Sequence, residues 1–168
     1  MRLSKYIVLS LFFLIISEVL ADDVESKVKK WVEEQSIKKQ LVILQSTKNY
    51  NEALRTAKLA SKTLKLKLDL RGLDHNDATG LTFSKEVCDG EGGFGYPCYI
   101  ARGRYDDGDY VSIEHSSAYS EFSNGFFIVV ASSHPKGSNE VTSVLELTRK
   151  HFKDSYAKTS MVYMGCMH

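Results

Sequence analysis

The stretches LVILQS (residues 41–46) and FIVVAS (residues 127–132) decide the fold of this chain. Both are short apolar runs that end in a serine, and each precedes an Asn-Glu pair, at residues 51–52 and 139–140. Apolar runs of this length are typical of buried strands. Because the same pattern occurs in both halves of the chain, it indicates an internal duplication.

Each run is followed by a segment with helical spacing and then by a second strand pattern. After the first run, Asn49 or Asn51 can cap a helix, and the alternating LKLDL (residues 66–70) predicts a returning strand. After the second run, Ser138 can cap a helix, and TSMVYM (residues 159–164) predicts the last strand. The chain therefore contains two predicted strand–helix–strand units.

Two such units in series predict an α+β fold. The order β-α-β-β-α-β places the strands in one antiparallel sheet with both helices on one face, and a sheet of this kind leaves its other face free. With Ser46 ending the first strand and Asn-Glu-Ala at residues 51–53, this duplicated βαβ pattern resembles the sporulation-related (SPOR) repeat domain. The resemblance covers residues 41–70 and 125–164. It implies an exported module that binds peptidoglycan glycan strands.

The two halves are farther apart here than the short connection that is usual in SPOR domains. We therefore expect a single SPOR-like domain over residues 41–168, with an insertion at residues 72–124. Cys88 and Cys98 are the natural disulfide pair across a glycine-rich loop of this insertion, although the sequence also allows Cys98 with Cys166. The segments 99–104 and 110–115 flank the turn sequence DDGD and predict an inserted, disulfide-closed β-hairpin.

The N-terminal residues predict export. Residues 1–21 have a basic start, an apolar core and small residues before a cleavage point, which is the pattern of a signal peptide. A retained membrane anchor is the alternative. After cleavage we expect no membrane insertion, a secreted or periplasmic location, and a segment 22–40 that is either a helix packed on the domain or a mobile leader.

Charge argues against a nucleic-acid partner. Without residues 1–21 the chain has 20 basic and 20 acidic residues, whereas nucleic-acid-binding proteins usually carry a basic excess. The distribution is uneven, with 12 basic and 5 acidic residues in 25–71 but 3 basic and 10 acidic residues in 74–121. One part of the surface is therefore expected to be positive and another negative.

The candidate ligand-binding residues all lie in the predicted hairpin: Tyr99, Arg102, Arg104, Tyr110 and Glu114. On a strand the two arginines share a face, where they can pair with Glu114 or hold a carboxylate or phosphate. The alternative is that these charges only form ion pairs between the strands of the hairpin. The tyrosines combine an apolar ring with a polar tip, which suits a sugar or peptide surface.

The same residues offer little evidence for catalysis. Glu114 and His115 are neighbours on a strand and point to opposite faces, which disfavours a catalytic pair. His75, His134 and His151 lack metal-ligand spacing, and the glycines lack the context of a dinucleotide or phosphate loop. Cys166, beside two methionines and His168, could bind a soft metal such as copper, but a free or packing thiol is the favoured interpretation. We therefore expect neither a metal nor a cofactor.

Together these patterns predict an exported, non-catalytic binding domain. Its expected partner is a peptidoglycan glycan strand, bound on the open sheet face or on the insertion, or a protein of the cell envelope. One alternative is a small secreted hydrolase that uses the 99–115 hairpin. Another is a protein-interaction accessory module that uses a free sheet edge or the segment 22–40.

Overall fold

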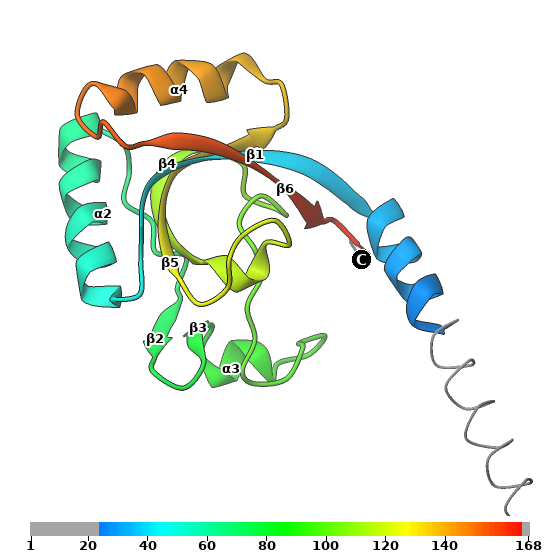
Figure 1. The fold of residues 1–168 in the computed structure, drawn as a ribbon. Coiled ribbons are helices and arrows are strands. Elements are labelled where there is room, and N and C mark those ends of the chain that lie inside the picture. Colours follow the sequence, from blue (N-terminus) through cyan, green and yellow to red (C-terminus); the bar gives the residue numbers. More distant parts are fainter. Residues whose placement is uncertain (1–23, 166–168) are drawn as a thin grey trace, which may run out of the picture.

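The computed structural model describes residues 24–165 of the chain (Figure 1). The predicted signal peptide at residues 1–21 and Cys166 lie outside the described residues. Within residues 24–165, none of the helices has the length and apolar character needed to cross a membrane.

The centre of the molecule is a four-stranded antiparallel sheet, which together with its helices makes an α+β fold (Figure 1). The strand order is β4-β5-β1-β6, with the strands β1 (Ser36–Thr47), β4 (Gly108–His115), β5 (Phe127–Pro135) and β6 (Tyr156–Tyr163). The two apolar runs that predicted the fold form the middle of β1 and the start of β5. These two strands are neighbours at the centre of the sheet, with Leu41 opposite Ser133.

Two helices cover one face of the sheet, as predicted. α2 (Tyr50–Leu64) and α4 (Asn139–Arg149) share one apolar cluster with the sheet, to which α2 contributes small buried side chains such as Ala57. Asn49 is the cap of α2, because its side chain accepts a hydrogen bond of 3.1 Å from the backbone N–H of Glu52. This contact satisfies one of the free N–H groups of the first turn.

The returning strand of the first unit does not form as predicted. Residues 66–70 make only an isolated parallel bridge, between Leu68 and Val111, at the outer side of β4. β4, which belongs to the insertion, takes the place beside β5 instead. The insertion therefore contributes a strand, β4, to the main sheet and does not form a separate hairpin outside it.

The predicted hairpin of residues 99–104 and 110–115 is also wrong. Residues 99–104 lie outside any strand, and β4 pairs with β5 from Gly108 opposite Ser133 to His115 opposite Phe127. In this position Val111 and Ile113 are buried in the same cluster as the α2 alanines. An isolated hairpin could not bury them, so pairing with β5 is favoured.

The rest of the insertion is built from short elements. It contains a small hairpin of β2 (Asp74–Asn76) and β3 (Gly80–Thr82), the helix α3 (Lys85–Cys88) and the 3-10 turn η1 (Ser116–Ala118). The predicted disulfide between Cys88 and Cys98 is confirmed and closes the loop after α3.

The second face of the sheet is covered in part, whereas we expected it to be free. Tyr119 is buried against a second apolar cluster of sheet residues that includes Ile43 and Val130, and Phe122 and Phe126 pack beside it. All three aromatic side chains come from the segment between β4 and β5. The segment between β4 and β5 therefore covers part of the sheet face that we expected to be open for a ligand.

The N-terminal segment is a helix over residues 24–34, and β1 begins directly after it at Ser36. Residues 36–40 are therefore strand, not helix. The helix projects away from the sheet (Figure 1), and most of its apolar side chains are not covered by the domain. Val24 and Val28 are more than half exposed, and Trp31 contacts the ring of Tyr163 at a centroid distance of 5.7 Å.

Candidate ligand-binding site

A buried ionic cluster lies around Glu114, near the C-terminal end of β4. Arg71 donates from Nη1 to Oε2 of Glu114 and from Nε to Oδ2 of Asp106, each at 2.7 Å, and from Nη2 to the carbonyl of Ile100 at 3.0 Å. The hydroxyl of Tyr99 donates to the same Oε2 of Glu114. Since Glu114 is fully buried and the Arg71 side chain is 9% exposed, this cluster is held in a low-dielectric environment.

The backbone aims Arg71 inward. Arg71 has a φ of 60°, and the following Gly72 has a φ of 64°. A left-handed conformation is uncommon for a residue other than glycine and carries a conformational cost. The N–H of Arg71 donates to Oδ1 of Asp69 at 2.8 Å, which stabilises this turn. The unusual backbone is therefore what brings the guanidinium to Glu114.

Arg102 has a different role from Arg71. Its guanidinium is fully buried and donates to the backbone carbonyls of Gly108, Tyr110 and Val130 and to the hydroxyl of Ser112. It also lies 3.5 Å from the ring centroid of Tyr110. Burial lowers the pKa of Arg102, because it disfavours the charged form. Arg102 thus holds the segment before β4 against the sheet.

Burial also controls the protonation of the tyrosines in this region. It raises the pKa of Tyr99 and of Tyr119 well above the usual range, and the nearby carboxylate of Glu114 acts in the same direction. Burial alone would lower the pKa of Arg71, but the negative charge of Glu114 and its neighbours outweighs it and raises this pKa. The phenols of Tyr99 and Tyr119 are therefore neutral, and the guanidinium of Arg71 is permanently charged.

Each aspartate of the DDGD sequence has a basic partner. Asp106 pairs with Arg71, Asp107 pairs with the buried Lys39 of β1, and Asp109 lies 2.8 Å from His134 of β5. Asp106 also accepts hydrogen bonds from the hydroxyl of Tyr110 at 2.9 Å and from the N–H of Gly103 at 3.0 Å. The loop before β4 is therefore tied to the sheet at several points.

A pocket of about 360 Å³, which we call the Arg71 pocket, opens beside this cluster. It is lined by aromatic, charged and aliphatic side chains from three segments: Asp69, Arg71, Phe83, Ile100, Tyr105, Asp106 and Tyr110. Tyr105 is 54% exposed. The pocket thus joins three aromatic rings to a guanidinium and two carboxylates, and its Arg71, Asp106 and Tyr110 groups are held in place by the contacts beneath.

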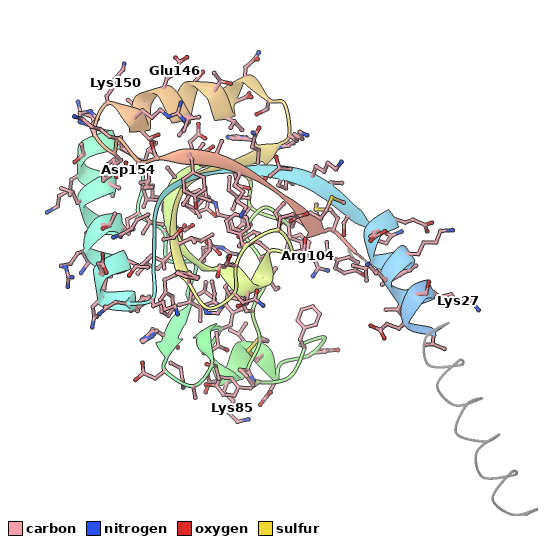
Figure 2. All side chains as sticks on the ribbon, viewed as in Figure 1. Lys27, Lys85, Arg104, Glu146, Lys150 and Asp154 are labelled. Carbon is pink, nitrogen blue, oxygen red and sulfur yellow. A yellow bond between two sulfur atoms is a disulfide. The ribbon has the colours of Figure 1, made fainter. Side chains whose placement is uncertain are left out.

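The structure brings together some of the predicted site residues and separates others. Tyr99, Tyr110 and Glu114 belong to the cluster, but only Tyr110 lines the pocket. The predicted pairing of Glu114 with Arg102 or Arg104 is wrong, because Arg71 occupies that position. Arg104 lies near the end of β6 (Figure 2), with its guanidinium 5.0 Å from the ring centroid of Tyr163.

Sequence reasoning missed Arg71 and Asp106. Arg71 directly follows the strand predicted at residues 66–70 and was assigned to a loop, and Asp106 was interpreted as part of a turn with solvated carboxylates. The only local signal was the Arg71-Gly72 dipeptide at a chain reversal, because glycine often marks a left-handed turn.

The geometry does not assemble the residues of the hydrolase alternative. Oε2 of Glu114 accepts from both Arg71 and Tyr99, and the carboxyl group is sealed from solvent. His115 points to the other side of β4, as predicted, where its ring contacts Phe127. Among residues 24–165 there is also no group of three or more histidine, cysteine, aspartate or glutamate side chains that could hold a metal ion.

Comparisons with known proteins leave the chain without an assigned family. No family model matches it, and neither a search of curated proteins nor a search of solved structures gives a match.

Proposed function

We propose that this chain is an exported, non-catalytic binding domain that holds a saccharide unit of a cell-envelope glycan in the Arg71 pocket. The observation that carries the proposal is the composition of this pocket. Rings of Phe83, Tyr105 and Tyr110 line the same space as the polar groups of Arg71 and Asp106. Sugar rings present apolar C–H faces and hydroxyl groups, and these match aromatic walls with a few fixed polar groups.

The charge of the pocket favours a neutral polyol as ligand. Asp69 and Asp106 can accept hydrogen bonds from sugar hydroxyls, and Arg71 can donate. Asp69 is paired with Lys67 at 2.7 Å and Asp106 with Arg71 at 2.7 Å, so each carboxylate of the pocket has a basic partner before a ligand enters. Groups that are already fixed lose little conformational entropy on binding, which favours affinity.

Export and the SPOR resemblance support the choice of an envelope glycan. The signal peptide predicted at residues 1–21 and the disulfide between Cys88 and Cys98 are both typical of proteins outside the cytoplasm. The SPOR resemblance suggests peptidoglycan in particular. Because the insertion covers part of the second sheet face, we place the glycan at the insertion rather than on the sheet.

Retention on purified peptidoglycan sacculi tests this proposal. We expect the mature chain to co-sediment with sacculi at moderate salt, and Tyr105→Ala to lose most of this binding. Phe94→Ala is the matched control, since Phe94 is an exposed aromatic residue of the same insertion, 67% exposed, that does not line the pocket. The proposal fails if the native chain is not retained, or if both variants bind as it does.

A second candidate function is a protein-interaction module. It is supported by the exposed apolar side chains of Val24, Val28 and Trp31 on the projecting helix, since such stripes often mark interaction sites. Sedimentation velocity over a range of concentrations, with and without the Val28→Ser exchange, tests it. A monomer at all concentrations and no co-purifying envelope protein would exclude this function.

A further inference from the structure

A second pocket, of about 190 Å³, lies where the end of β1 and the start of β6 meet the segment between β4 and β5. It shares no lining residue with the Arg71 pocket. Its walls include the rings of Phe122 and Phe126, and Lys158 and Tyr156 line it from β6. A volume of this size corresponds to about six water molecules at ~30 Å³ each, which is enough for a small organic ligand.

Two lysine ammonium groups lie over the aromatic walls. Nζ of Lys158 is 4.4 Å from the centroid of Phe122, and Nζ of Lys48 is 5.4 Å from the centroid of Phe126. Stacking of this kind holds a cation in place but leaves its charge uncompensated. Within residues 24–165, neither ammonium group forms a salt bridge with a carboxylate.

The carboxylates closest in sequence to Lys48 and Phe122 are Glu52 and Glu121, and both accept hydrogen bonds from uncharged groups. Glu52 accepts from the side chains of Gln45 and Thr47, each at 2.7 Å. Glu121 accepts from the hydroxyl of Ser160 and from the N–H of Met161 at the edge of β6. Among the described residues, the lining of this pocket includes Lys158 and no acidic side chain, and neither Glu52 nor Glu121 forms a salt bridge with the Lys158 ammonium group.

The remaining polar groups of the pocket are hydroxyls. Oγ of Ser46 and the hydroxyl of Tyr156 lie 3.3 Å apart at its rim, and either of them can donate. Hydroxyl groups beside an ammonium group match a ligand that carries both a carboxylate and hydroxyls. The aromatic walls suit the apolar face of such a ligand.

We propose that the Lys158 pocket binds the carboxylate of a small hydroxylated acid such as a sugar acid. The Lys158 ammonium group pairs with the carboxylate, and Ser46 and Tyr156 receive the ligand hydroxyls. This assignment does not depend on the Arg71 pocket, since the two sites use different residues.

Calorimetric titration of the mature chain with glucuronate, and with glucose as the matched neutral sugar, tests the assignment. We expect binding of glucuronate and none of glucose. Lys158→Gln should weaken glucuronate binding by about tenfold, the effect of losing one charge-assisted contact. Lys58→Gln removes the same charge from an exposed position on α2 and should leave the affinity unchanged.

Two further arms make the result specific. Tyr105→Ala changes only the Arg71 pocket and should leave glucuronate binding intact, so failure of one site can be told from failure of the other. Acetate should bind much more weakly than glucuronate, because it lacks hydroxyls. The assignment is overturned if glucuronate does not bind, if glucose or acetate binds as tightly, or if Lys158→Gln and Lys58→Gln behave alike.

Discussion

Replacement of Glu114 by glutamine tests whether the buried cluster beneath the ligand pocket stabilises the fold. The exchange keeps the size of the side chain but removes the charge that pairs with Arg71 at 2.7 Å and accepts from Tyr99. A hydrogen bond to a charged group contributes about 1.5–3 kcal/mol, and breaking a fully buried ion pair costs about 3–5 kcal/mol. Because Arg71 keeps Asp106 as a partner, we expect a loss of about 2–3 kcal/mol in the free energy of unfolding.

Urea denaturation and thermal unfolding measure this loss. For a domain of this size 1 kcal/mol corresponds to about 2–4 °C, so the melting temperature should fall by about 4–12 °C. Glu34→Gln is the matched control, since Glu34 faces Lys30 at 3.9 Å with both side chains more than half exposed. Its effect should stay within about 0.5 kcal/mol. If Glu114→Gln costs no more than Glu34→Gln, the cluster does not stabilise the fold and the reasoning is wrong.

Three further predictions concern stability. Burial raises the pKa of Tyr99, whereas this phenol ionises near pH 10 in the unfolded chain. The contribution of Tyr99 to the free energy of unfolding is therefore complete below pH 10 and falls above pH 10 by up to about 1.4 kcal/mol per pH unit. Between pH 8 and 11, the urea midpoint of Tyr99→Phe should therefore drop less steeply than that of the native chain. Equal slopes would contradict this prediction. Replacing Cys88 and Cys98 by serine should cost about 2–3 kcal/mol, because the closed loop spans a sequence separation of 10; an unchanged melting temperature would refute it. Asn49→Ala should cost about 1 kcal/mol through loss of the α2 cap, while Asn51→Ala should cost less, and the reverse order in urea denaturation would show that the cap is misassigned.

Local patterns were enough to predict the main elements of the fold. The middle of β1, the start of β5, both long helices and the end of β6 each follow a hydrophobic period that can be recognised within a few residues. The same holds for the loop between Cys88 and Cys98, where proximity in sequence indicated the disulfide. These features depend on neighbours along the chain.

The partner of β4 could not be predicted in the same way. A strand pattern identifies which residues form a strand but not which strand lies beside it. The turn sequence before Tyr110 suggested a local hairpin, but pairing with β5 buries Val111 and Ile113 between the sheet and α2. The favourable burial of these two side chains depends on the strands and the helix that surround them, and local sequence patterns do not show it.

The site was predicted in part for a similar reason. Tyr99, Tyr110 and Glu114 were placed in one region because they are close in sequence; Tyr99 donates to Glu114, whereas Tyr110 is connected to Glu114 only through Asp106 and Arg71. Arg71 comes from a distant segment and reaches Glu114 through a left-handed backbone that arginine rarely adopts. Arg102 was expected to bind a carboxylate, but it is surrounded by backbone carbonyls whose positions depend on the tertiary fold.

The central claim is that the Arg71 pocket binds a saccharide, and an NMR titration tests it most directly. Amide spectra of the isotopically labelled mature chain would be recorded while soluble glycan fragments released from peptidoglycan are added. We predict saturable shifts that cluster at Arg71, Tyr105 and Asp106 and that disappear in Tyr105→Ala. Saturable shifts confined to other parts of the molecule, or no shifts at millimolar glycan, would contradict the claim.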